Sequence, residues 1–415
     1  MVKIKPFKAI RPTEKYASEI ASLPYDVLNS NEARIIGDQN EKSFLHIDKA
    51  EIDLAEEGSP YAQQVYQKAA ENLKDFLQKG WLVQEDAEQF YLYQLTMNGR
   101  SQMGLVVCAS IEDYVGNNIK KHEFTREEKE VDRIRHVDAT DANTSPIFLT
   151  YRDQESIDAL IKKWAAENEP IYHFSSFHAV EHTVWVIDQE AVRDKLKQLF
   201  DQDVTELYIA DGHHRTESAV KVALKRKETH PNAPDESEFN YFLAVLFPKS
   251  QLAIWDYNRV VKGLIQEDFL EKLAEKFDVE KVPSPYKPEQ PKTIGMYVND
   301  KWYKLTVKPA YISNHPVQGL DVSLLQEHIL TPLFGIEDIR TDKRIDFIGG
   351  IRGMQALSDA VDEGAFSAAF SMYPTTIDEL IRVADSGEVL PPKSTWFEPK
   401  LLSGLFVHDL ESKWK

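Results

Sequence analysis

The stretch Leu207-Tyr208-Ile209-Ala210-Asp211-Gly212-His213-His214-Arg215 joins a short apolar run to a group of ionisable side chains across one glycine. The apolar run predicts a short buried strand over 207–210, and the residues after Gly212 predict a helix over about 213–227. A strand, a glycine and a helix N-terminus in succession are typical of an anion-binding site. The first-turn N–H groups have no helical partners, and the helix dipole favours negative charge there.

The side chains at this junction suit a phosphate ligand. Gly212 lets the backbone approach a ligand closely, and Arg215 can direct two donors at one phosphate. His213 and His214 point about 100° apart on a helix, so we expect different roles for them. Asp211 is a candidate base, a candidate Mg²⁺ ligand or the helix N-cap. The alternative is structural: Asp211 caps the helix and the histidines are surface polar residues. A zinc site is the weaker interpretation, because adjacent histidines rarely bind one metal and the His-Glu-x-x-His spacing is absent.

A second group of ionisable residues begins at His122-Glu123-Phe124-Thr125. Thr125 and Glu128 fit a capping box, which predicts a helix that starts at Arg126. His122 and Glu123 then lie just outside a helix N-terminus, as Asp211 does. We therefore expect the two segments to meet in one anion-binding cleft, although about ninety residues separate them.

The predicted helix carries Arg126, Lys129 and Arg133 at spacings of three and four residues, which places them on one face. Contacts from this face to a phosphate or carboxylate would explain why an acidic protein keeps basic residues here. The alternative is a solvated surface helix with internally paired charges, because Val131 and Ile134 are its only apolar anchors.

Three other segments contain candidate ligand contacts. Ser22–Leu28 contains Asp26, a candidate catalytic carboxylate that can also stabilise a turn. Pro391–Lys400 is irregular and proline-stiffened, and its Lys393 is a candidate anion contact, although such a loop can also be a packed C-terminal clasp. Gly349–Gly353 lies between a predicted strand and a helix, but it lacks the P-loop ending and the GxGxxG spacing.

Local patterns predict the elements of the first part. A helix is expected from Pro60 to Lys79, with Ser59 as its N-cap and Gly80 just past its end. Asn98-Gly99 predicts a hairpin between strands over 90–97 and 101–111. Further strand pairs are expected over 171–177 with 183–187, 241–247 with 252–256, and 293–298 with 301–307.

The C-terminal part alternates helices and strands, expected as helices over 322–330, 353–361 and 376–384 and strands over 345–348 and 365–372. Residues 266–290 become charged and then proline-rich, which indicates a boundary between a phosphate-binding part, 1–265, and a C-terminal α/β part, 266–415. Hairpins combined with this alternation favour a mixed α/β (α+β) fold with partly antiparallel sheets over one doubly wound sheet.

The composition excludes several classes of partner. The 415 residues carry a net charge of −19, so the surface repels nucleic acid and anionic membrane, and neither is expected as a partner. No window approaches the ~20 apolar residues of a membrane span, and the N-terminus lacks the apolar region of a signal peptide. The single cysteine, Cys108, lies in an apolar run and predicts a core residue. With no disulfide possible, a cytoplasmic location is expected.

Several motifs together resemble, over almost the whole chain, the bacterial and archaeal family catalogued as domain of unknown function 1015. These motifs are Leu23–Val27, Lys121–Thr125, Lys129–Arg133, Ile209–Arg215, Tyr257–Val260 and Pro391–Leu401. Ala210–Arg215 also looks like the Asp-Gly-His-His-Arg box of free serine kinases, among the ParB-like and sulfiredoxin-like nucleotide-binding folds. This resemblance implies such elements in the first part, with nucleotide phosphates at the helix N-terminus. For the catalytic glutamate of those kinases, Glu123 and Glu32 are both candidates.

These observations predict a phosphotransferase that acts on a small hydroxylated metabolite, with serine as one candidate, and that uses ATP or ADP and Mg²⁺ as cofactors. The candidate catalytic residues are Glu123, Asp26, Asp211 and His213, with Asp211 also the candidate metal ligand. The candidate phosphate contacts are Gly212, His213, His214, Arg215, Arg126, Lys129, Arg133 and Lys393. One alternative is a non-enzymatic nucleotide-binding regulatory protein. The other is a metal-dependent hydrolase that uses His122, Glu123, Asp211, His213 and His214.

Overall fold

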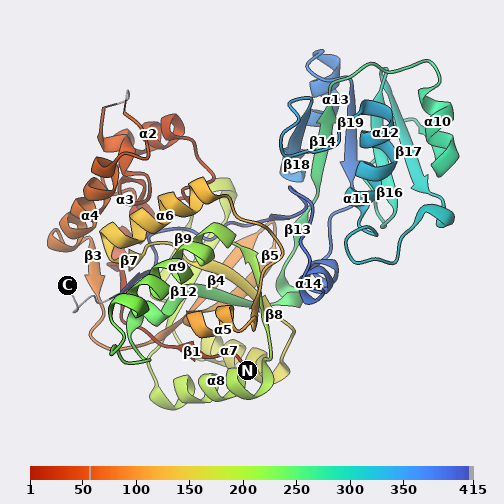
Figure 1. Ribbon diagram of the computed structural model, residues 1–415. Helices are drawn as coiled ribbons and strands as arrows, with labels where there is room; N and C mark the ends of the chain where they lie inside the picture. Colours follow the sequence, from red (N-terminus) through yellow and green to blue (C-terminus); the bar gives the residue numbers. More distant parts are fainter. Residues whose placement is uncertain (56–57, 411–415) are drawn as a thin grey trace. The chain divides into compact units, whose positions relative to one another are not determined.

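The computed structural model describes residues 1–55 and 58–410, which divide into two compact units (Figure 1). The first unit comprises Met1–Leu252 together with the C-terminal segment from Pro399 on, and the second comprises Ala253–Glu398. The boundary expected between residues 265 and 266 therefore differs from the observed division. The charged stretch that suggested it contains α10 (Phe269–Lys276) and β15 (Phe277–Val282), which are regular elements of the second unit.

A mixed sheet forms the centre of the first unit. Within the described residues it has nine strands, in the order β6-β11-β8-β12-β5-β4-β10-β9, with β1 paired to β5. Strands β6 and β8 run parallel to β11 and β12 respectively, and the other neighbours are antiparallel. The strands are β1 (Ile4–Lys5), β4 (Phe90–Met97), β5 (Arg100–Ser110), β6 (Ile119–Lys120), β8 (Ile147–Tyr151), β9 (Tyr172–Ser175), β10 (Glu181–Ile187), β11 (Leu207–Asp211) and β12 (Tyr241–Pro248). The expected mixed α/β class is confirmed.

Turn chemistry explains two outcomes in this sheet. The hairpin at Asn98-Gly99 is confirmed: both residues have positive φ, 52° and 76°, as the tight turn between β4 and β5 requires. The expected pairing of 241–247 with 252–256 is wrong. Both edges of β12 are already occupied by β5 and β8, so β13 (Ile254–Trp255) pairs with β20 (Trp396–Phe397) in the second unit.

Helices and a small sheet complete the first unit. The helices are α1 (Ala17–Ile20), α2 (Ser30–Gln39), α3 (Leu45–Asp48), α4 (Gln63–Gln78), α5 (Ile111–Val115), α6 (Glu127–Thr140), α7 (Glu155–Glu167), α8 (Glu190–Asp203) and α9 (His213–Thr229). The order of the small sheet is β3 (Leu82–Gln84), β2 (Ala9–Pro12), β21 (Val407–Asp409) and β7 (Ala142–Asn143). Helices α6 and α9 pack side by side (Figure 1). This contact brings the two ionisable segments of the sequence together.

Helix α4 begins later than its sequence predicts. Ala62 is the N-cap in place of Ser59, and no side chain caps the helix. The predicted end is confirmed, because Gly80 has a φ of 67° and its N–H bonds to the Leu77 carbonyl. The apolar stripe through Val65, Leu73 and Phe76 is buried, as its helical spacing predicts.

The second unit is built on a six-stranded sheet in the described residues, with all neighbouring pairs antiparallel. Its order is β15, β17 (Lys301–Val307), β16 (Thr293–Val298), β19 (Ala368–Met372), β14 (Tyr257–Val261) and β18 (Ile345–Gly349). Its other helices are α11 (Asp321–Leu325), α12 (Thr331–Phe334), α13 (Gln355–Asp362) and α14 (Ile377–Asp385). The predicted alternation of helices and strands after residue 320 is confirmed, and a π-helical segment over Gln326–Leu330 continues α11.

The main core of the first unit lies against the large sheet and includes Leu105, Val107, Leu149, Ile209 and Leu246. Cys108 is fully buried in β5, which confirms it as a core residue. In residues 1–55 and 58–410, no helix combines the length and the apolar character that crossing a membrane requires.

Candidate functional site

The ends of two parallel strands form the site. Tyr208 of β11 pairs with Lys120 of β6, so both strands end at the same edge of the sheet. His122 follows the last residue of β6 by two positions, His213 follows the last residue of β11 by two positions, and their two rings are in contact. The centroids lie 4.4 Å apart at an interplanar angle of 81°. The expectation that these two segments meet is therefore confirmed, because Glu123 Oε2 lies 3.8 Å from His213 Nδ1.

Both histidines are buried, whereas Glu123 is half exposed. The His122 N–H contacts His213 Nε2 at 3.4 Å, which is long for a hydrogen bond. Burial is the main cause that lowers the pKa of His122 to about 3. Burial, followed by the neighbouring His122, also lowers the pKa of His213 well below its usual value. Both imidazoles are therefore neutral at pH 7, and each can act as an acceptor or a metal ligand.

Gly212 forms the turn between β11 and α9 as the helix N-cap, with φ 97°. A bulge in the pairing of β11 with β8, between Ile209 and Asp211, redirects the strand just before this turn. Both carboxylate oxygens of Asp211 are engaged: Oδ1 accepts from the Gly212 N–H at 2.9 Å, and Oδ2 lies 3.1 Å from Lys400 Nζ. Burial alone would raise the pKa of Asp211, but Lys400 and Arg215 hold it below its usual value.

Arg215 lies under the first turn of α9, where its side chain is partly buried and its Nε is buried. One terminal nitrogen donates to the Pro146 carbonyl at 2.7 Å, and its Nε has no hydrogen-bond partner in the described chain. Burial alone would lower the pKa of Arg215, but Asp26 and Asp211 raise it. The exposed Asp26 also acts electrostatically on His214. The predicted Asp26 is thus within electrostatic reach of the Asp211–Arg215 segment.

Helix α6 differs from both of its sequence interpretations. It begins at Glu127 with Arg126 as an uncapped N-cap, so the predicted capping box is wrong. The Thr125 hydroxyl instead donates to the Glu130 carboxylate, which also pairs with Lys221 of α9. The solvated-helix alternative is wrong as well, because α6 packs against α9 and α4 and buries one face.

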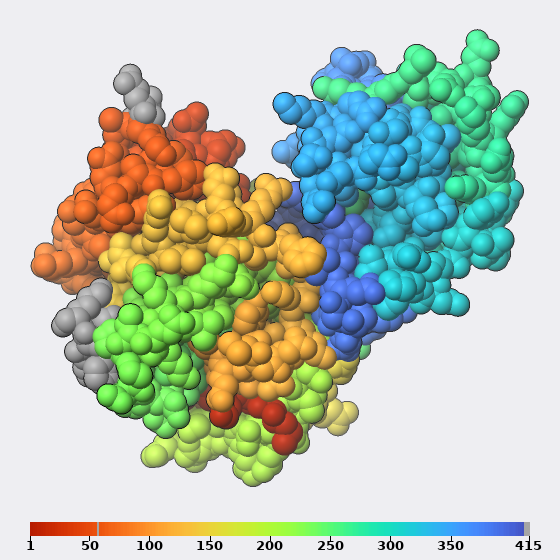
Figure 2. All heavy atoms as spheres, viewed as in Figure 1, coloured from red at the N-terminus to blue at the C-terminus, as the bar shows by residue number. Residues whose placement is uncertain are grey.

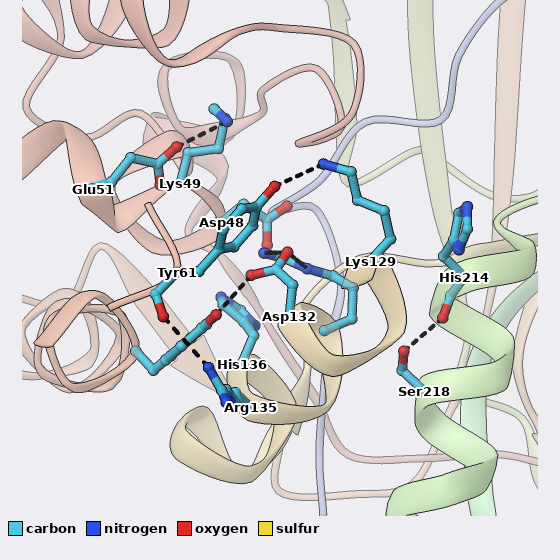
Figure 3. A network of polar contacts seen from close by, with 12 residues as sticks. Asp48, Lys49, Glu51, Tyr61, Lys129, Asp132, Arg135, His136, His214 and Ser218 are labelled. Carbon is cyan, nitrogen blue, oxygen red and sulfur yellow. Dashed lines mark hydrogen bonds and ion pairs between the residues drawn. The ribbon is translucent and has the colours of Figure 1, made fainter. Parts of the chain in front are cut away.

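The three basic residues of this segment have different environments. The exposed Arg126 donates its backbone N–H to His214 Nδ1 at 3.4 Å. Lys129 donates to the Tyr61 hydroxyl at 3.1 Å, an interaction drawn in Figure 3. Arg133 is buried, bonds to Asp132 at 2.9 Å and lies 4.0 Å from the centre of the Tyr25 ring. Only Arg133 reaches the interior of the site.

A cavity of about 30 Å³ lies beneath these residues. Its lining consists of Tyr25, Arg133, His136, Val137, Asn143, Thr144, Ser145, Ile147, Arg215 and Ala219. Asp48, fully buried nearby, accepts hydrogen bonds of 2.7 Å from both Thr144 and Ser145. Burial would raise the pKa of Asp48, but His136 and Arg133 lower it, so the carboxylate is charged. Figure 3 shows Asp48, Asp132 and His136 close to one another around this region. Two guanidinium groups, those of Arg133 and Arg215, therefore line a cavity whose wall is otherwise largely apolar.

Lys393 does not belong to this cluster, which consists of first-unit residues. It lies in the second unit, where its ammonium is 5.6 Å from the centre of the Tyr257 ring and its carbonyl accepts from Arg259. In the Gly349–Gly353 segment, a Cβ at Gly350 would meet the Asp256 carboxylate at 2.3–2.4 Å, so an acidic group occupies that side of the predicted anion loop.

Sequence reasoning missed four polar residues of the site. Lys400 lies in the proline-rich loop that the sequence singled out, but the pattern pointed to Lys393 instead. Asp48 and Ser145 belong to no motif and become neighbours only through the fold. His136 had a weak signal, since it follows Arg133 by three residues and shares its face of α6.

The fold and the site define a mixed α/β protein with a strand–glycine–helix junction in its first unit. A family model described as "Protein of unknown function (DUF1015)" matches residues 4–323, and the chain belongs to this family. The expected family is therefore confirmed. A search among curated proteins finds no match.

Solved structures show a distant likeness. A free serine kinase in complex with AMP has 13% sequence identity and a TM-score of 0.36, and the match covers 73% of this chain and 91% of that one. SbnI from Staphylococcus aureus, with a C-terminal truncation, has 13% identity, a TM-score of 0.38 and coverage of 74% and 90%. A conserved hypothetical protein from Pyrococcus furiosus has 14% sequence identity and a TM-score of 0.35, and the match covers 74% of this chain and 96% of that one. Similarity this low carries no conclusion about function.

Proposed function

We propose that the first unit binds a nucleotide by its phosphates at the N-terminus of α9 and transfers a phosphoryl group to a small hydroxylated metabolite. One observation carries the proposal. The partly buried Arg215 has a buried Nε without a hydrogen-bond partner in the described residues, at a helix N-terminus that begins with a left-handed glycine. Free backbone N–H groups, a helix dipole and a fixed guanidinium are the groups that phosphate binding uses.

The cavity beside Arg215 supports a phosphate rather than a whole nucleotide as its occupant. A volume of about 30 Å³ has room for one or two water-sized groups, which suits phosphoryl oxygens. Arg133 and Arg215 supply its positive charge. The sugar and base then lie outside, on the side of the exposed Asp26 and Arg126.

Phosphoryl transfer needs a proton acceptor and a cation beside the phosphates. Asp26 and Glu123 are the candidate bases, because both are exposed carboxylates close to the junction. Asp211 is a poorer Mg²⁺ ligand than its position in the sequence suggests, since the Gly212 N–H and Lys400 already engage its oxygens. Mg²⁺ would be held mainly by the nucleotide phosphates and one exposed carboxylate, as is usual for this ion.

The test is calorimetric binding of ATP, ADP and AMP, and of guanine and cytidine nucleotides, each with and without Mg²⁺. We expect one nucleotide per chain, and ligand at about 100 times its Kd should stabilise the first unit by about 2.7 kcal/mol. Turnover is then followed by ³¹P NMR with hydroxylated metabolites. Serine is the first of these, because Ala210–Arg215 resembles the free serine kinase box. Binding without turnover of any metabolite would favour a regulatory role, and absence of binding would overturn the proposal.

Arg215→Lys is the decisive variant. Lysine keeps the charge but loses the planar donor group, so we expect nucleotide affinity to fall at least about tenfold. Because Arg215 also donates to the Pro146 carbonyl, the free protein should melt at a somewhat lower temperature. Arg226→Lys, in the last turn of the same helix and paired with Asp141, is the matched control and should bind nucleotide normally. Equal affinity in both variants would place Arg215 outside the phosphate site.

A further inference from the structure

His122 is a buried polar residue with no partner for either ring nitrogen among the described residues. It is 1% exposed, and its ring contacts His213 edge to face. Leaving two buried nitrogens without hydrogen bonds costs free energy, so native proteins rarely do it unless a ligand binds there. An aromatic contact with His213 would be made equally well by phenylalanine, which has no polar atoms to satisfy.

The neighbours of His122 complete a set of metal ligands. His122, Glu123 and His213 each offer one ligand atom, and the three atoms lie within 4.8 Å of one another. Zn²⁺ binds nitrogen and oxygen at about 2.0–2.2 Å in tetrahedral geometry, so two of its ligand atoms lie about 3.3–3.6 Å apart. Binding therefore requires the ligand atoms to approach one another by up to about 1.5 Å. Glu123 can make part of this movement, because its side chain is half exposed.

We propose that His122, Glu123 and His213 bind one divalent transition-metal ion of the Zn²⁺ type. Two imidazoles and one carboxylate are a donor set that such ions favour, whereas Mg²⁺ and Ca²⁺ prefer oxygen ligands. Three protein ligands leave at least one coordination position open for water or for a ligand oxygen. The exposed side of Glu123 provides a path from solvent.

The local electrostatics are compatible with a cation. The N-terminus of α9 opposes positive charge, since the helix dipole is positive at this end. The Glu123 carboxylate and the charged Asp211, which acts electrostatically on both His122 and His213, offset this effect.

This metal site stands apart from the proposed phosphoryl transfer and can be tested without it. The two proposals share one residue, Glu123. An ion bound to Glu123 would leave Asp26 as the base of the transfer reaction. A metal ion beside the first turn of α9 would also face a phosphate bound there. In Figure 2 the green surface of α9 adjoins the orange and yellow surface of the α5–α6 segment.

The experiment measures metal binding by the full-length protein, freed of any histidine tag and of metal. Zn²⁺ is titrated by calorimetry with a competing chelator, Co²⁺ binding is followed by its visible absorption, and Mg²⁺ is added at millimolar concentration as a competitor. The variants are His122→Phe, which keeps an aromatic ring, and Glu123→Gln, an exposed change that should leave the fold intact. Glu127→Gln, an exposed residue in the first turn of α6, is the matched control.

We expect one Zn²⁺ per chain, unaffected by Mg²⁺, and a Co²⁺ spectrum typical of nitrogen and oxygen ligands. Glu123→Gln should weaken binding by at least about tenfold, His122→Phe should abolish the Co²⁺ spectrum, and Glu127→Gln should change neither. Circular dichroism shows whether each variant is folded. Failure of the folded wild-type protein to bind Zn²⁺ stoichiometrically would overturn the proposal, as would equal affinity in Glu123→Gln and Glu127→Gln.

Discussion

At the scale of single residues, Gly212 decides the geometry of the site. Its φ of 97° is accessible to glycine and strained for other residues, and it turns the chain from β11 into α9. A Cβ at this position would lie 3.2 Å from Nε and one terminal nitrogen of Arg215. The residue therefore meets two requirements at once: a backbone conformation and the space that the guanidinium occupies.

The substitution Gly212→Ala separates these two requirements when it is compared with Gly99→Ala. Gly99 also has positive φ, 76°, but a Cβ there meets nothing within 4 Å. Both variants should lose about 1 kcal/mol or more of stability from backbone strain. Only Gly212→Ala should also lose nucleotide affinity, because it displaces Arg215. Denaturant unfolding and calorimetry measure the two effects, and unchanged nucleotide affinity in Gly212→Ala would contradict this explanation.

At the scale of elements, the C-terminal segment is an integral part of the first unit. Strand β21 lies between β2 and β7, and the residues that lead to it, Leu401–Phe406, are buried. Lys400, at the start of this segment, is the ion-pair partner of Asp211. The segment therefore links the core of the first unit directly to its candidate site.

Phe406→Ala tests this role of the segment. Phe406 is fully buried, and the centroid of its ring lies 5.2 Å from that of Tyr91 and 6.0 Å from that of Tyr93. We expect a loss of about 3–5 kcal/mol, as for other buried phenylalanines. Phe124→Ala is the control, because Phe124 is 71% exposed and should cost little. Urea unfolding of both variants gives the comparison, and a small loss for Phe406→Ala would show that the segment does not stabilise the unit.

At the scale of the whole molecule, ligands should stabilise the first unit and leave the second unit unaffected. The candidate site, the cavity and the proposed metal ligands all belong to the first unit, whereas the second has its own antiparallel sheet and core. Ligands that bind a native state raise the stability of the unit that contains their site.

Differential scanning calorimetry should therefore resolve two transitions, of which only one moves to higher temperature with nucleotide. Phe406→Ala assigns the transition of the first unit. Phe370→Ala, in the centre of β19 and fully buried, assigns that of the second. Arg215→Lys should reduce the nucleotide-dependent shift. A shift of both transitions by the same amount would contradict this expectation, because it would show that the nucleotide stabilises the second unit as well.

The sequence alone determined the features that depend on local patterns. The apolar run before Gly212, the Asn98-Gly99 turn and the alternating elements after residue 320 predicted the strand–glycine–helix junction, the hairpin and the mixed α/β class. Each signal arises from a few neighbouring residues, whose backbone preferences and side-chain periodicity act over short distances. The acidic composition also determined the net charge of −19, which does not depend on the fold.

Only the tertiary structure decided which distant residues meet. Strand β6 has just two residues, too few for a recognisable pattern, yet its parallel pairing with β11 places His122 beside His213. Lys400 reaches Asp211 because the chain returns to the first unit after Glu398, a path that no local pattern encodes. The predicted start of α6 was wrong for a related reason. The Thr125 hydroxyl donates to Glu130, which also pairs with Lys221 of α9, so a contact between two helices replaces the predicted capping box.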